Sequence, residues 1–249
     1  MLEMCINQGA GLQSLALQAA PRVMALASHG DQQGELPLLW SLCAALASLG
    51  QSVAVLDATA VESVDNPGLT QMLEQAAWRA SDNAELSSCA VIPSALGLQQ
   101  LCAPTWTPGL ALLPLSDLFQ SFGVVIIYAR ADVLSHLLLD SGIEPLLMVA
   151  PVKTSALTAY QALKQMFLNA QLRPTVVNMT NEPEAAAANR STIKNLQKCA
   201  MTFLNYPLDS LAVRALPAQE CQADDVQRLA LQLLERAMPL HRNHFVGSH

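Results

Sequence analysis

The chain has 249 residues, of which 52% are hydrophobic and 13% charged, so a single large α/β domain can bury a sizeable core. A net charge of −7 without any basic patch argues against nucleic-acid binding, and no apolar run reaches the roughly 18–20 residues of a membrane-spanning helix. The six cysteines are scattered without a CxxC pair, which favours reduced thiols in a cytoplasmic protein over disulfides or a metal site.

In chain order, apolar runs that predict strands alternate with stretches that predict helices. The first half contains strand 22–27, helix 38–49, strand 52–56, helix 69–79, strands 110–113 and 124–128, and helix 131–141. The second half contains strand 145–150, helix 155–169, strand 175–179, a surface loop at 182–188, and helices 190–204 and 224–238. Continuous apolar strands separated by helices predict a doubly wound, mainly parallel sheet with helices on both faces.

We expect residues 21–240 to form one domain, with a partner-binding segment at 1–20 and a polar tail at 241–249. The last helix, 224–238, carries an apolar face. Its polar face is not rich in lysine and its apolar face lacks Trp and Phe, so we expect it to dock on the protein's own core rather than on a membrane.

The first strand–helix connection is the first place to look for a ligand site, because ligands bind beyond the carboxyl ends of strands in open α/β sheets. Residues 28–37 have the length and position of a phosphate-binding P-loop. Such a loop needs glycines, a Lys that reaches the phosphates and a Ser or Thr that binds Mg²⁺. Here Ser28 and two glycines remain, but Glu35 stands where the Lys is needed and Leu36 where the hydroxyl is needed.

This connection resembles the deviant Walker A loop, KGGVGKT, of the MinD/ParA class of P-loop ATPases. In that alignment Gly34 is kept, Gly30 and Glu35 replace the two lysines, and Asp31 and Gln32 replace two glycines. Carboxylates in the loop would repel a triphosphate, each by on the order of 1–4 kcal/mol at 4 Å. The resemblance therefore implies a P-loop NTPase fold of the SIMIBI class that has lost ATP and Mg²⁺ binding.

Two further strand ends carry the same resemblance. Residues 53–59 resemble the family's switch segment, a hydrophobic strand followed by DAD; Asp57 matches its first Asp, and Thr59 replaces the second, water-positioning Asp. Residues 124–128 resemble the Walker B strand, with Tyr128 in place of its Asp. These replacements imply a site without catalytic residues.

Three later segments follow in family order. Residues 149–155 resemble the turn TTPEPTS, and residues 206–214 resemble IPEDPAVR. Residues 176–179 resemble the strand VVNM, whose Asn reads adenine and corresponds to Asn178. The nucleotide-site remnants are thus Ser28, Gly30, Gly34, Asp57 and Asn178.

The same residues also have simpler interpretations. Asp57 can cap a turn at a strand end, a role that Asp commonly fills. Tyr128 can fill the space left by a lost charged site, and its buried hydroxyl then needs a hydrogen-bond partner. His29 and His136 lack an Asp or Ser relay in the sequence, so we interpret them as structural or exposed.

Within the class, the sequence is most similar to FlhG, also called FleN, which regulates flagellar number. Residues 7–13 resemble the motif DQAxxLR, which engages the GTPase FlhF, with Gln8 and Leu12 as exact matches. Residues 193–204 resemble a helix of that family. The resemblance implies a protein partner, either an FlhF-like GTPase or an intact MinD/FlhG-like relative.

Together these features predict a non-hydrolysing, cytoplasmic regulator that acts through protein contacts, with the inner membrane or cell pole as a peripheral location. Two alternatives remain. One is an ATPase with an unconventional site, for which Arg22, Arg130 and Lys153 are the cations expected near the carboxyl edge of the sheet. The other is an adaptor in another polar or envelope system, such as cellulose secretion or partition.

Overall fold

The computed structural model describes residues 20–30, 32–74, 89–103, 110–150, 153–180, 185–214 and 221–240. Its strands are β1 Arg22–Ser28, β2 Val53–Asp57, β3 Cys89–Pro93, β4 Val124–Arg130, β5 Leu146–Val149, β6 Thr175–Thr180, β7 Ser210–Arg214 and β8 Met238–Pro239. Its helices are α2 Gln32–Ser48, α3 Leu69–Glu74, α4 Ala95–Leu101, α5 Leu113–Leu118, α6 Ala131–Leu137, α7 Lys153–Ala170, α8 Ala185–Leu204 and α9 Cys221–Arg236.

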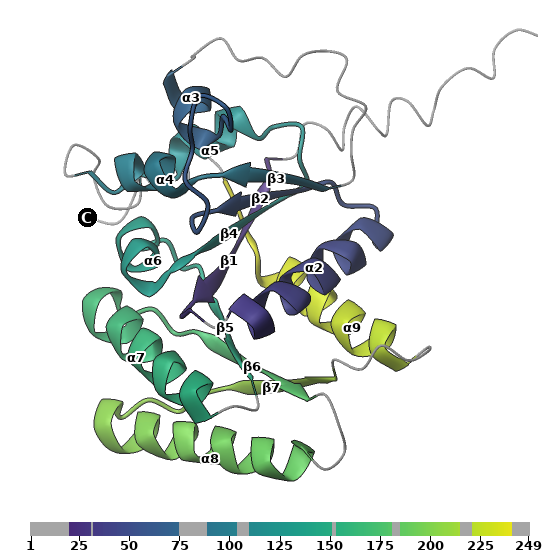
Figure 1. Cartoon of the computed structure of the whole chain (residues 1–249), viewed down its shortest axis with the longest axis vertical. Helices are drawn as coiled ribbons and strands as arrows, with labels where there is room; N and C mark the ends of the chain where they lie inside the picture. Colours follow the sequence, from purple (N-terminus) through teal and green to yellow (C-terminus); the bar gives the residue numbers. More distant parts are fainter. Residues whose placement is uncertain are drawn as a thin grey trace, which may run out of the picture.

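The strands form one sheet in the order β3-β2-β4-β1-β5-β6-β7, and β8 pairs with β1 (Figure 1). All the pairs along this path are parallel, and only the short β1–β8 pair is antiparallel. The sheet is covered on both faces, so the predicted doubly wound α/β fold is confirmed.

Two hydrophobic cores lie on the two faces of the sheet. Side chains of α2 and α9 pack on one face, and side chains of α3 to α8 pack on the other. Figure 1 shows α2 and α9 side by side on one side of the sheet and α6 and α7 on the other. The central strand β4 is buried from Val124 to Ala129 because both of its faces are covered, which explains its uninterrupted apolar sequence. In the described residues, no helix is long and apolar enough to cross a membrane.

Four short elements were not predicted from the sequence, and one predicted strand is wrong. Residues 110–112 form a turn and residues 113–118 form α5, where a strand was predicted at 110–113. A four-residue apolar run does not distinguish strand from helix, and Pro114 in the first turn favours the helix. The unpredicted elements are β3, α4, β7 and β8, all of seven residues or fewer.

Four helices begin earlier than predicted: α7 and α9 by two and three residues, and α2 and α8 by more. The helix predicted at 38–49 begins at Gln32, so it takes in most of the expected P-loop. Helix α8 begins at Ala185, inside the predicted loop 182–188. Helix α2 thus extends for more than a turn on the amino side of Pro37. The partner-binding segment 1–20, apart from residue 20, and the tail 241–249 lie outside the described residues.

One buried carboxylate, Glu62, joins the connection after β2 to the start of α4. The residue is 4% exposed. Its side chain accepts hydrogen bonds from the backbone N–H groups of Leu96, at 2.7 Å, and Gly97, at 2.8 Å, and from the hydroxyl of Thr70, at 3.1 Å. Burial alone would raise the pKa of Glu62, but these hydrogen bonds outweigh it and the pKa is lowered.

We predict that Glu62→Gln lowers the free energy of unfolding at pH 7 by about 1–3 kcal/mol, because the amide accepts fewer and weaker hydrogen bonds than the carboxylate. The folded-state pKa lies below the unfolded value of about 4.3, so the carboxylate stabilises the fold above that pH and its contribution is lost as the pH falls through the folded pKa. Urea unfolding from pH 7 to pH 3 should therefore show the two proteins converging at the acid end.

The exposed carboxylate of Asp65, in the same connection, provides the control. Asp65→Asn makes the same change of charge and should alter stability by less than about 0.5 kcal/mol at every pH, as surface substitutions usually do. If the loss of unfolding free energy in Glu62→Gln stays constant down to pH 3, the role assigned to the carboxylate is wrong.

Candidate functional site

The carboxyl ends of β1, β2 and β4 meet beneath the first turn of α2. The ladders place Tyr128 of β4 beside Leu26 of β1 on one side and beside Asp57 of β2 on the other. Helix α2 follows β1 after only three residues, which brings Glu35 over the same strand ends. The structure thus brings together four residues singled out in the sequence: Ser28, Glu35, Asp57 and Tyr128.

Glu35 is completely buried and turned toward the sheet. One carboxylate oxygen, Oε2, accepts a hydrogen bond from the hydroxyl of Tyr128 at 2.5 Å. The other, Oε1, accepts one from the backbone N–H of His29 at 2.9 Å. The sequence predicted a carboxylate that repels ligands from a loop, whereas the structure shows a helix side chain that holds the β1–α2 connection from inside.

Tyr128 is fully buried and remains a hydrogen-bond donor. Burial raises the pKa of its phenol, and the hydrogen bond to Glu35 and the negative charges of Glu35 and Asp57 raise it further. A hydrogen bond with the Ser28 side chain acts in the opposite direction. The expectation that a buried Tyr128 needs a hydrogen-bond partner is confirmed, and the partner is Glu35.

The ring of His29 extends this network to α7 and β5. Its Nε2 lies 2.8 Å from the carbonyl oxygen of Met148 and 3.4 Å from Oε1 of Glu35, and its Nδ1 lies 2.8 Å from Oγ1 of Thr158. Since a carbonyl only accepts, Nε2 carries a hydrogen. The structural interpretation of His29 is therefore confirmed, but the residue also has a carboxylate partner that the sequence analysis did not find.

The hydroxyl of Thr158 lies at the α7 end of this network. Oγ1 lies 3.1 Å from the carbonyl oxygen of Thr154 and 3.2 Å from that of Ser155, as well as near the His29 ring. A hydroxyl has one proton. The Thr158 hydroxyl can therefore donate to only one of these three neighbouring atoms.

Asp57 caps its own turn. Its Oδ1 accepts hydrogen bonds from the backbone N–H of Thr59 at 2.8 Å and from the Thr59 hydroxyl at 2.6 Å. This is the local hydrogen bonding by which Asp commonly stabilises a turn. The geometry supports the simpler of the two interpretations, in which both residues that resemble the switch segment serve the turn.

The other predicted site residues are distributed around this network. Gly30 has a φ of +93°, which favours glycine, and a Cβ added there would meet no other atom within 4 Å. Gly34 and Leu36 lie within α2, as does the backbone of Gln32. Asn178 lies on β6, paired with Val149 and Ala212, and its side chain is outside the described part, as is the whole of Asp31.

The three cations expected near the carboxyl edge do not all lie there. Arg22 begins β1 at the opposite, amino edge, and its Nη1 donates to the carbonyl oxygen of Leu234 at 2.8 Å, so that expectation was wrong. Arg130 ends β4 at the carboxyl edge, but its side chain is 75% exposed and pairs with Asp132 at 3.3 Å. Lys153 begins α7, and only its backbone is described. Arg22 is the first residue of a strand in a parallel sheet, so it lies at the amino edge, and the expectation assigned it to the wrong end of that strand.

Within the described ranges, no group of three or more His, Cys, Asp or Glu residues is arranged to hold a metal ion. The hydrogen-bonding atoms of Glu35 and Tyr128 are directed at each other. The arrangement therefore supplies a stable internal connection between β1, α2 and β4.

Comparison with known proteins shows which solved structures have a similar fold. No protein-family model and no curated protein matches the sequence. Among solved structures, a chain of the MinC:MinD cell division protein complex of Aquifex aeolicus aligns at 13% identity, with a TM-score of 0.58, over 89% of this chain and 98% of that chain. Cobyrinic acid a,c-diamide synthase of Mycobacterium smegmatis with bound ADP and magnesium aligns at 16% identity, with a TM-score of 0.62, over 86% and 94%.

A plasmid partition protein of Borrelia burgdorferi aligns at 14% identity, with a TM-score of 0.56, over 86% of this chain and 99% of that chain. At these identities the likeness is one of fold. The structural neighbours thus include MinD- and ParA-like P-loop ATPases, as the resemblance of the sequence predicted, and they do not single out FlhG.

We predict that Tyr128→Phe lowers the free energy of unfolding by about 1–3 kcal/mol at pH 7, because a buried carboxylate loses a donor. The folded-state pKa of Tyr128 lies above the unfolded value of about 10, so its contribution is complete below pH 10 and is lost as the pH rises beyond it. Unfolding in urea between pH 7 and pH 11 should show a smaller alkaline loss in the variant.

Tyr160→Phe on α7 is the matched control, since this half-buried tyrosine lies outside the network. Its stability at pH 7 should differ from that of the unaltered protein by less than about 0.5 kcal/mol. Equal stability of Tyr128→Phe and the unaltered protein at pH 7 would show that the hydrogen bond to Glu35 does not contribute.

Proposed function

We propose that this protein is a non-hydrolysing regulator with the MinD/ParA fold, in which the protein's own carboxylate replaces ATP and Mg²⁺ as the group held at the end of β1. The observation that carries the proposal is the buried Glu35, with hydrogen bonds from the backbone N–H of His29 and from the hydroxyl of Tyr128. The protein then acts through protein contacts.

The hydrogen-bond donors of the β1–α2 connection determine whether it can bind an anion. A P-loop holds phosphate with backbone N–H groups and a Lys. Here a backbone N–H of this connection, that of His29, already donates to an anion, the carboxylate of Glu35. A phosphate in its place would require Glu35 to leave its donors or to share a buried site with a second negative charge, and both are unfavourable.

The residues that replace the metal-binding groups support the same proposal. Tyr128 stands where the resembled family has its Walker B Asp, and its raised pKa keeps the phenol neutral and unsuited to Mg²⁺, which prefers carboxylate and phosphate oxygens. Asp57 and Thr59 hydrogen bond to each other within one turn. The residues present do not fit a nucleotide with its metal, so no catalytic step is assigned to them.

The proposed partners are proteins. The MinD neighbour is part of a complex with MinC. For this chain we propose an FlhF-like GTPase or an intact MinD/FlhG-like relative, engaged through the segment 1–20 that contains Gln8 and Leu12, in control of flagellar number or placement. We propose that the protein acts in the cytoplasm or peripherally at the inner membrane or cell pole.

We predict that isothermal titration with Mg-ATP and Mg-ADP gives no saturable heat up to about 1 mM, an affinity limit of roughly −4 kcal/mol. An intact MinD protein serves as the positive control. Saturable binding at micromolar concentration would overturn the proposal. Phosphate release that Arg130→Ala abolishes would instead favour the ATPase alternative, in which this exposed arginine at the carboxyl edge supplies the missing charge.

We also predict that the full chain binds a purified FlhF-like GTPase and that Leu12→Asp weakens binding at least tenfold, since a charge replaces an apolar anchor. Leu2→Asp, outside the motif at 7–13, is the matched control and should bind as the unaltered chain does. Equal binding of all three proteins would exclude the motif as the contact. If the chain binds an intact MinD-like relative but not the GTPase, the proposed flagellar role is wrong. The proposal that the protein is a regulator would still hold.

A further inference from the structure

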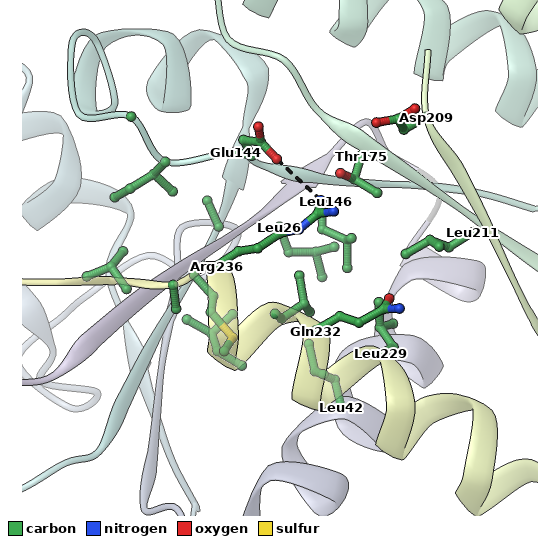
Figure 2. Close-up of a pocket in the computed structure, with 18 residues that line it drawn as sticks. Leu26, Leu42, Glu144, Leu146, Thr175, Asp209, Leu211, Leu229, Gln232 and Arg236 are labelled. Carbon is green, nitrogen blue, oxygen red and sulfur yellow. Dashed lines mark ion pairs between the residues drawn. The ribbon is translucent and has the colours of Figure 1, made fainter.

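A cavity of about 390 Å³ lies at the amino edge of the sheet, at the opposite end of β1 from Glu35 (Figure 2). It exists because β1 changes partners along this side. Its first residues, Arg22 and Val23, pair with β8, and only Leu26 and Ala27 pair with β5. The two residues between them have no strand partner on this side, so the sheet opens between β1 and β5.

Aliphatic side chains line the interior of this cavity, and α9 covers it. The main apolar lining residues are Met24, Leu26, Leu42, Leu146, Leu229 and Leu233. They come from β1, β5, α2 and α9, so the cavity is built from rigid elements rather than loops. A small ligand with an apolar part could therefore bury that part without reordering the chain.

Polar groups gather at the mouth of the cavity. Glu144 precedes β5, Asp209 precedes β7, and Arg236 ends α9. Figure 2 shows Arg236 extending across the opening toward Glu144, with their nearest nitrogen and oxygen 3.5 Å apart. Since both side chains are at least half exposed, this ion pair is weak and can rearrange around a ligand.

Among the residues that line the cavity, two carboxylates face one guanidinium, which gives the lining a net negative charge. Arg236 already pairs with Glu144, and in the described part of the chain no side chain donates a hydrogen bond to the carboxylate of Asp209. Burial raises the pKa of the neighbouring Tyr206, and the charges of Asp209 and Glu144 raise it further, against the opposing charge of Arg173 beyond the lining.

We propose that this amino-edge cavity binds a small amphipathic cation, a short aliphatic chain that carries a primary ammonium group. The chain lies among the leucines under α9, and the ammonium donates to Asp209 at the mouth. The volume is near the lower end of small-molecule sites, which span roughly 300–1,000 Å³. An anionic head would face the two carboxylates, and a neutral head would leave Asp209 without a charged partner. This site is independent of the proposed function.

Three probes with the same chain separate the contributions of tail and head: octylammonium chloride, octanol and sodium octanoate. Each is titrated into the full-length protein and followed by calorimetry. We expect octylammonium to bind about threefold more tightly than octanol, because an ion pair with the exposed Asp209 contributes little, and octanoate to bind more weakly than both.

Two variants test the site. Asp209→Asn should make the affinities for octylammonium and octanol equal, while Asp65→Asn, which makes the same charge change in an exposed connection far along the chain, should leave all affinities unchanged. Ala237→Leu adds carbon atoms to a residue that lines the cavity and should abolish binding of all three probes. Thermal unfolding of each variant verifies that it is folded, and Asp209→Asn changes only an exposed side chain.

The outcomes are distinct. Preference for octylammonium that is lost in Asp209→Asn supports the proposal. Equal affinity for the three heads, preference for octanoate, no binding by any probe, or binding that persists in a folded Ala237→Leu each overturns it. None of these outcomes bears on the nucleotide titration, because the two sites lie at opposite edges of the sheet.

Discussion

The burial of one carboxylate, that of Glu35, sets the arrangement around it. A charged group with no exposed surface is strongly unfavourable unless donors surround it. The hydroxyl of Tyr128 and the backbone N–H of His29 provide two such donors, and the His29 ring adds a third polar contact. These contacts are consistent with the start of α2 and the short connection after β1, and they explain why a tyrosine is tolerated near the carboxyl end of a strand that is apolar from Val124 to Ile127.

Glu62 repeats the same arrangement elsewhere in the fold. There too a buried carboxylate accepts backbone N–H groups, those of Leu96 and Gly97, at the start of a helix. Ends of helices and strands in α/β folds are places where anions bind, because free N–H groups point outward there. In this protein two such places hold carboxylates of the chain itself, which joins distant segments without any ligand.

The sequence predicted the central strands and long helices well because their apolar pattern depends only on burial. The strand at 124–128 is β4, buried on both faces. Glu35 and Tyr128 were each recognised as departures from the family pattern, but their contact joins residues 93 positions apart, and no local pattern contains it. Thr158, 129 positions from His29, was missed for the same reason. The short elements β3 and α4 and the cavity at the amino edge depend on tertiary packing that periodicity does not report.

The hydrogen bond between Tyr128 and Glu35 also has an evolutionary consequence. A single change of Glu35 to lysine would bury a positive charge and remove the acceptor that Tyr128 and His29 share. A single change of Tyr128 to aspartate would set two carboxylates against each other. Each residue therefore makes a single substitution of the other costly, so that the two positions would change together rather than one at a time. Selection on stability alone would then preserve the pair, whatever partner the protein serves.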